Sequence, residues 1–327
     1  MGITVGIPRA LAYHDYFPLW KVFLSSLGAE LVVSPPTNQA IVNDGVRLAV
    51  DGTCLPVKIF YGHVSWLSKA GVDSIFLPRL ISVAPKEYIC PKFMGLPDMM
   101  AAAFPNGLRF ISPVINLTHS SRLFYQELEK VGKWLGCTAP DTRRAWDKAL
   151  AAQESYQSFL QGGNWPAEYE TQQDKEAELT VSRPLDTPSL RIGLLGHSYV
   201  VYDKLASMDA VNRLQGMGVE VLTVDMLPPA RIEAQAARWP KRMFWTSGRR
   251  ILGAAWEYTE MSVDGIIYIT AFGCGTDSLT AELVERTVRR RSHIPQLILN
   301  IDEHTGEAGV VTRLEAFVDM LRWRRGR

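Results

Sequence analysis

The sequence contains only 4 cysteines among 327 residues, and no two of them form a Cys-x-x-Cys pair. So sparse a set excludes a disulfide framework. The spacing is also not that of a zinc ribbon, a thioredoxin-like site or a ferredoxin-type cluster motif. Any site that uses several of these cysteines must therefore be assembled by folding.

Net charge, long apolar runs and nucleotide motifs are lacking as well. The 35 basic residues balance 34 acidic ones, so no overall field would attract nucleic acid. No apolar run reaches the roughly 18 residues of a membrane helix, and the first residues lack the basic region of a signal peptide. Neither G-x-G-x-x-G nor G-x-x-x-x-G-K-[ST] occurs. We expect a cytoplasmic protein with a small-molecule substrate and neither nucleic-acid nor membrane partners.

Apolar strands alternate with helical patterns from the start of the chain. Residues 3–7 and 30–34 are expected strands, residues 18–27 are an expected helix between them, and the same order returns over residues 191–223. Residues 162–189 are polar and rich in turn formers, which indicates a linker. The α/β class is therefore expected, with two doubly wound parallel-sheet (Rossmann-like) lobes joined by a helical linker.

This pattern predicts three parts. Residues 1–140 form a first lobe with Cys54 and Cys90, residues 141–189 form a helix and linker, and residues 190–327 form a second lobe with Cys274.

Cys274 lies where a strand is expected to end and a helix to begin. The apolar run 264–271 precedes it, glycines flank it, and Asp277 or Ser278 is expected to cap the helix that follows. In open α/β sheets ligands bind at this edge, and a helix amino end favours an anion. The sequence thus points to Cys274 as the centre of a site.

Two more cysteines have comparable positions. Cys54 precedes a helix with Pro56 in its first turn, and Cys90 lies in a loop beyond the strand at 74–77. Cys137 lies at a junction between two helices and is interpreted as a partly buried thiol. Three thiolates suit an iron–sulfur cluster or, less well, a zinc site, and nearby lysines such as Lys58 and Lys92 would stabilise an anionic cluster.

Several segments strengthen the cluster interpretation. They are Val5–Leu11, Ser34–Thr37, Cys54–Lys58, Glu87–Phe93, Gly95–Asp98, Gly273–Ser278 and Asp302–Gly309. With them, nearly the whole chain resembles the acyl-CoA dehydratase activase-related proteins. These are similar to the cluster-bearing subunits of 2-hydroxyacyl-CoA dehydratases and, more distantly, to the double-cubane cluster proteins.

The resemblance implies an oxygen-sensitive [4Fe–4S] or double-cubane cluster in an interdomain cleft, held by Cys54, Cys90 and Cys274. It also implies an anaerobic setting and electrons from an ATP-hydrolysing, actin-like activase that carries its own cluster. A homodimer is a further expected partner. The activity would be that of a 2-hydroxyacyl-CoA dehydratase-like lyase or of an ATP-dependent reductase component acting on a small substrate such as an acyl-CoA.

Other charged residues are weaker candidates. Glu303 and His304 follow the last strand, where a proton donor would act. The alternative interpretation is that they have a structural role in capping the closing helix. Arg9, Lys58 and Arg79 are candidates for holding an anionic substrate. Two other functions stay open: a non-catalytic iron–sulfur carrier or accessory protein, and a zinc-stabilised α/β binding protein.

Overall fold

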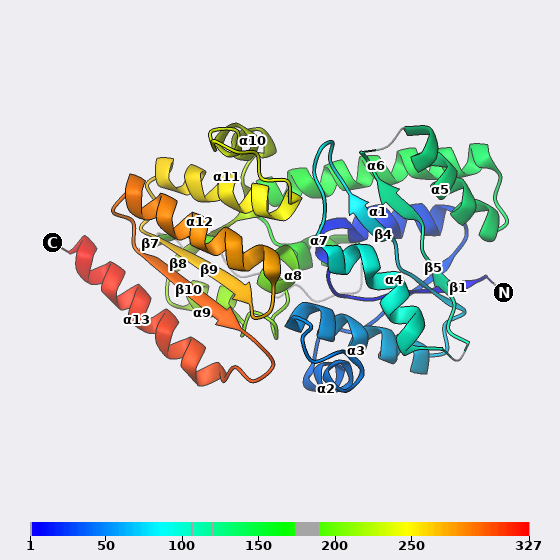
Figure 1. The fold of residues 1–327 in the computed structure, drawn as a ribbon, viewed down its shortest axis with the longest axis horizontal. Helices are drawn as coiled ribbons and strands as arrows, with labels where there is room; N and C mark the ends of the chain where they lie inside the picture. Colours follow the sequence, from blue (N-terminus) through cyan, green and yellow to red (C-terminus); the bar gives the residue numbers. More distant parts are fainter. Residues whose placement is uncertain (1, 106, 119–120, 174–189, 327) are drawn as a thin grey trace. The chain divides into compact units, whose positions relative to one another are not determined.

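The computed structural model describes residues 2–326 except 106, 119–120 and 174–189 (Figure 1). The chain forms two compact units, one of Met1–Tyr156 with Phe244–Thr246 and one of Gln157–Met243 with Ser247–Arg327. The boundaries expected at residues 140 and 189 stay a prediction, and most of the expected linker lies outside the described residues.

The first unit contains a four-stranded parallel sheet in the order β2-β1-β3-β5. Its strands are β1 (Thr4–Ile7), β2 (Glu30–Val33), β3 (Ser74–Phe76) and β5 (Phe110–Ile111), and a separate parallel pair is formed by β4 (Arg79–Ser82) and β6 (Val114–Asn116). Its helices are α1 (Tyr13–Ser26), α2 (Gln39–Leu48), α3 (Leu55–Lys69), α4 (Pro91–Ala103), α5 (Ser121–Trp134) and most of α6 (Ala139–Gln161). Helix α1 lies on one face of the four-stranded sheet, and α2 and α3 lie on the other (Figure 1).

The second unit repeats this plan with a parallel sheet in the order β10-β9-β7-β8. Its strands are β7 (Leu190–Leu195), β8 (Val219–Thr223), β9 (Gly265–Ala271) and β10 (Gln296–Ile301). Its helices are α7 (Pro166–Gln173), α8 (Ser198–Val201), α9 (Ala210–Gly216), η1 (Val224–Met226), α10 (Pro229–Ala236), α11 (Thr246–Glu260), α12 (Gly275–Arg291) and α13 (Glu307–Arg325). Helices α11 and α12 cover one face of the sheet, and α9 and α13 cover the other (Figure 1).

Both sheets are parallel and flanked by helices, so the expected doubly wound α/β class is confirmed. Every residue of β9 is buried, as expected of a central strand covered on both faces. The core beside β9 is made by apolar side chains of α11 and α12, with Tyr258 fully buried and its hydroxyl donating to the Leu222 carbonyl at 2.7 Å. This packing fixes the carboxyl end of β9, where Cys274 follows.

Helix α1 starts earlier than the sequence indicated. It begins at Tyr13 and contains Pro18, although proline was expected at its first turn. Pro18 cannot donate to the carbonyl of His14, but the Tyr156 hydroxyl donates to that carbonyl instead, at 2.8 Å. A side chain from α6 therefore satisfies the group that proline leaves unpaired.

The helix expected at 204–217 is shorter than predicted. Only Ala210–Gly216 is α-helical, because the Asp203 carboxylate accepts from the backbone N–H groups of Leu205 and Ala206, and Met208 and Asp209 have positive φ. Among the described residues no helix is long and apolar enough to cross a bilayer.

Candidate metal centre

Three of the four cysteines occupy the same kind of position in their helices. Cys54 is the N-cap of α3, Cys90 is the N-cap of α4, and Cys274 is the N-cap of α12. None of these helices has a side-chain capping hydrogen bond at this position. The first N–H groups of a helix lack intrahelical partners and carry the positive end of its dipole. Each of these thiols therefore stands where negative charge is favoured.

Cys137 lies in a different environment. It follows the end of α5, and its thiol donates to the backbone carbonyl of Leu27 at 3.4 Å. This contact suits a thiol that helps to pack the first unit.

The turn before Cys274 is built by its glycine and its backbone hydrogen bonds. Gly273 has a φ of +75°, which a side chain would strain, and Cys274 N–H donates to the Ala271 carbonyl at 3.0 Å. The Ser278 side chain and backbone N–H both bond to the Cys274 carbonyl. Cys274 is consequently the cap itself, whereas the sequence suggested Asp277 or Ser278.

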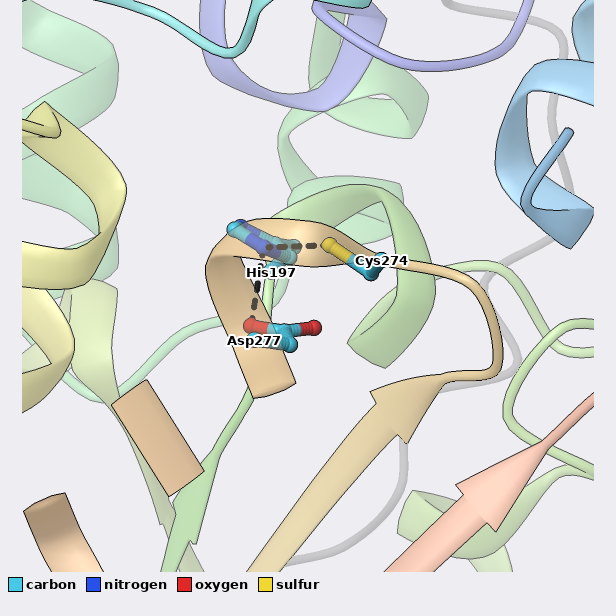
Figure 2. A group of neighbouring side chains, drawn as sticks. All are labelled: His197, Cys274 and Asp277. Atoms are coloured by element: carbon cyan, nitrogen blue, oxygen red, sulfur yellow. Dashed lines mark hydrogen bonds and ion pairs between the residues drawn. The ribbon is translucent and has the colours of Figure 1, made fainter. Parts of the chain in front are cut away.

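Asp277 faces inward from the first turn of α12 and meets His197, which follows β7 (Figure 2). His197 Nε2 lies 3.0 Å from Asp277 Oδ1 and 3.9 Å from Cys274 Sγ. The Tyr268 hydroxyl donates to the same carboxylate oxygen at 2.8 Å, and the Tyr199 ring stacks on His197 with 4.8 Å between centroids. His197, Cys274 and Asp277 are all buried.

The carboxylate decides the charge of the histidine. Burial alone would lower the pKa of His197, but Asp277 and Cys274 oppose this and raise it well above its ordinary value. Burial and the neighbouring Asp277 raise the pKa of Tyr268 as well, so Tyr268 stays a hydrogen-bond donor. His197 and Asp277 thus lie within ion-pairing distance of each other, at 3.0 Å, beside the thiol.

The geometry differs from that of a relay triad. In a relay the histidine uses one ring nitrogen for the acid and the other for the nucleophile, whereas here Nε2 alone faces both Asp277 and Cys274. The ligand atoms of His197, Cys274 and Asp277 all lie within 4.8 Å of one another, so the three could hold a metal ion. Asp277 Oδ2 is buried and has no hydrogen-bond partner among the described residues.

The topology explains why these residues meet. Strands β7 and β9 are neighbours, and the connections leaving them lie on opposite faces of the sheet, which makes their carboxyl ends the switch point of the second unit. His197 follows β7, and Cys274 follows β9.

Residues 4–227 match the family described as CoA enzyme activase uncharacterised domain (DUF2229). The chain belongs to this family. Residues 221–321 match a second family, the D-component of 2-hydroxyglutaryl-CoA dehydratase. The resemblance expected from the sequence is therefore confirmed. No curated protein matches the chain.

In this activase-related chain, the Cys54 and Cys90 segments fall in the first match and Cys274 falls in the second. The sequence reasoning missed Asp277 as an inward-facing group. No local pattern placed His197 beside Cys274 either. The signal was that both residues immediately follow buried strands of one sheet.

The predicted basic residues of the first unit have varied surroundings. The Arg9 guanidinium lies over the Tyr13 ring, 5.1 Å from its centroid, and Lys58 is buried in α3. Arg79 donates to both oxygens of Asp98, at 2.7 and 2.8 Å, and to the Met94 carbonyl at 2.6 Å. Any anion that binds Arg79 must therefore displace or join Asp98.

The predicted acid–base residues lie in the turn after β10. The His304 side chain is 84% exposed and Glu303 is largely covered, with 4.0 Å between His304 Nε2 and Glu303 Oε1. Asp302 holds the turn by accepting from His304 N–H and from the Thr305 hydroxyl. The accessible His304 ring is free to meet a reactant from solvent.

His63 gives this chain a testable acid sensitivity. It is fully buried and bonded to the hydroxyls of Ser34 and Thr37. Its pKa is lowered from 6.5 to about 3 by burial and by the electrostatic effect of Arg9 and His14. Below pH 6.5 His63 takes up a proton in the unfolded chain but stays unprotonated in the folded chain. From this group, the free energy of unfolding should fall by about 1.4 kcal/mol per pH unit from pH 6.5 down to about 3.

Denaturant unfolding between pH 7 and 4 tests this sensitivity. His63→Gln should flatten the dependence of the unfolding free energy on pH. Equal slopes for the wild type and His63→Gln would contradict the assignment.

Proposed function

We propose that this protein binds a [4Fe–4S]-type cluster through Cys54, Cys90 and Cys274. We propose further that it acts in the low-potential reduction of a small substrate such as an acyl-CoA. The main support for this proposal is that all three thiols are helix N-caps. The chain also matches activase and dehydratase-component families. Cys137, which lacks this position, is not a ligand in this proposal.

The residues near the thiols fit an anionic cluster. Lys58 lies buried one helical turn after Cys54, and Lys92 lies in the first turn of α4 after Cys90. Lys92 Nζ is buried with no hydrogen-bond partner among the described residues. A buried ammonium without a partner is costly, and a cluster held by three thiolates carries net negative charge. This charge complementarity supports the proposal.

The proposed division of labour follows from chemistry. The cluster would supply low-potential electrons, delivered by an ATP-hydrolysing activase partner. Arg9, Lys58 and Arg79 would hold anionic groups of the substrate, and Glu303 or His304 would donate a proton. Three thiolates would leave one iron of a cubane without a cysteine ligand.

A second candidate function is a mononuclear metal site, such as one for zinc. It is favoured by the close approach of His197, Cys274 and Asp277, whose ligand atoms lie within 4.8 Å of one another. Three protein ligands with an open fourth position are typical of catalytic zinc sites.

Anaerobic purification with iron, sulfide and zinc analysis separates the two candidates. About four irons and four sulfides per chain, with a visible absorption band that bleaches on reduction, are expected from the cluster. One zinc per chain without sulfide would contradict the cluster and support the mononuclear metal site. Repeated turnover with activase, ATP and an acyl-CoA is expected of a catalyst, whereas a single transfer of the cluster would identify a carrier.

A further inference from the structure

The Cys274 sulfur has two potential hydrogen-bond donors beside it. Thr276 Oγ1 lies at 3.2 Å and His197 Nε2 lies at 3.9 Å. Thr276 is 4% exposed and His197 is 6% exposed, so water competes little with either contact. Once the sulfur loses its proton to bind a metal, it can only accept, and the threonine hydroxyl must then donate to it.

Both donors are held in place by other groups. Asp277 fixes the His197 ring from one side at 3.0 Å, Tyr268 fixes Asp277, and Tyr199 stacks on the ring. Thr276 belongs to the first turn of α12 and is buried there, so the helix backbone and the surrounding packing hold its side chain. The arrangement is therefore preorganised around the sulfur rather than formed when a ligand arrives.

We propose that Thr276 and His197 are positioning residues that set the electron density on the Cys274 sulfur. Through it they would set the potential at which the cluster accepts an electron. This inference rests on the proposed function, because it concerns the same thiolate. Donors to a ligand sulfur withdraw charge from it and favour the reduced, more negative state, which raises the reduction potential.

The distances rank the two residues. Thr276 is the nearer donor and has its hydroxyl available for the sulfur. His197 Nε2 lies closer to Asp277 Oδ1, at 3.0 Å, than to the sulfur, at 3.9 Å. A proton on Nε2 would therefore be shared between the two in a three-centre hydrogen bond, with the sulfur as the weaker acceptor. Thr276 should therefore have the larger effect on potential.

The deciding experiment compares two threonine-to-valine variants of the holoprotein. Thr276→Val removes the hydroxyl beside the sulfur and keeps the shape of the side chain. Thr280→Val is the matched control, because Thr280 is also buried in α12, but its hydroxyl bonds to a carbonyl. Redox titration followed by paramagnetic resonance should give a lower midpoint potential for Thr276→Val only. Resonance Raman spectra should show a higher iron–cysteine stretching frequency in the same variant.

Histidine variants provide a second measurement. His197→Ala should also lower the potential, by less than Thr276→Val, and His197→Gln should restore part of it through its amide donor. If His197→Ala fails to fold, the comparison of Thr276→Val with Thr280→Val still tests the inference.

Wild-type potential and Raman frequencies in Thr276→Val, with full iron, would overturn this inference and leave the proposed function standing. Equal shifts in Thr276→Val and Thr280→Val would also overturn it, because packing would then be the cause. Absence of iron and sulfide from the wild type would instead remove the proposed function.

Discussion

Alanine at Cys54, Cys90 or Cys274 should reduce the iron bound after anaerobic reconstitution to a small fraction of the wild-type content. A site with three thiolates has no spare ligand, so each loss leaves an iron without its protein bond. The measurement is iron and sulfide per chain, with the visible absorption of the cluster as a second readout.

Loss of iron can be distinguished from unfolding in these variants. None of the three cysteines makes a side-chain capping hydrogen bond, so alanine removes no capping interaction from α3, α4 or α12. Circular dichroism should therefore be close to that of the wild type.

Cys137→Ala is the matched control and should keep its iron. Full iron content in Cys90→Ala would contradict the three-cysteine proposal. Loss of iron in Cys137→Ala would indicate a closed site with four cysteine ligands.

Much of the fold follows from local sequence, but helix α4 does not. Pro91 suits its first turn, whereas Pro97 inside it argues against a helix. Arg79 bonds to the Met94 carbonyl and the Asp98 carboxylate, on either side of Pro97. Tertiary contacts with a distant arginine thus hold a helix that local propensity disfavours, and Cys90 becomes a helix cap rather than a loop residue.

Only part of the site could be predicted, because the rest of it also depends on tertiary contacts. Cys274 could be placed from its flanking strand, glycines and helix pattern alone. His197 precedes it by 77 residues, and its approach depends on β7 lying next to β9. That neighbourhood is a property of strand order, which no local pattern encodes. The inward direction of Asp277 likewise depends on where α12 begins.

The close packing of α2 against α3 depends on two glycines. A Cβ on Gly45 would lie 1.9 Å from the Lys58 carbonyl oxygen, and a Cβ on Gly62 would lie 1.9 Å from the Ile41 carbonyl oxygen. Both obstacles are backbone atoms, which cannot rotate away as a side chain can. The position of α3, and with it that of Cys54 and Lys58, therefore depends on backbone contact between these helices.

Gly62→Ala should consequently destabilise the protein by about 3 kcal/mol or more, at or beyond the upper end of ordinary overpacking, because the helices must separate. Gly95→Ala in α4 is the matched control: a Cβ there meets nothing within 4 Å, and alanine in a helix should stabilise by up to about 1 kcal/mol. Urea unfolding followed by circular dichroism measures both. A Gly62→Ala protein as stable as the wild type would show that α2 and α3 can separate at little cost, and that their contact does not fix the amino end of α3.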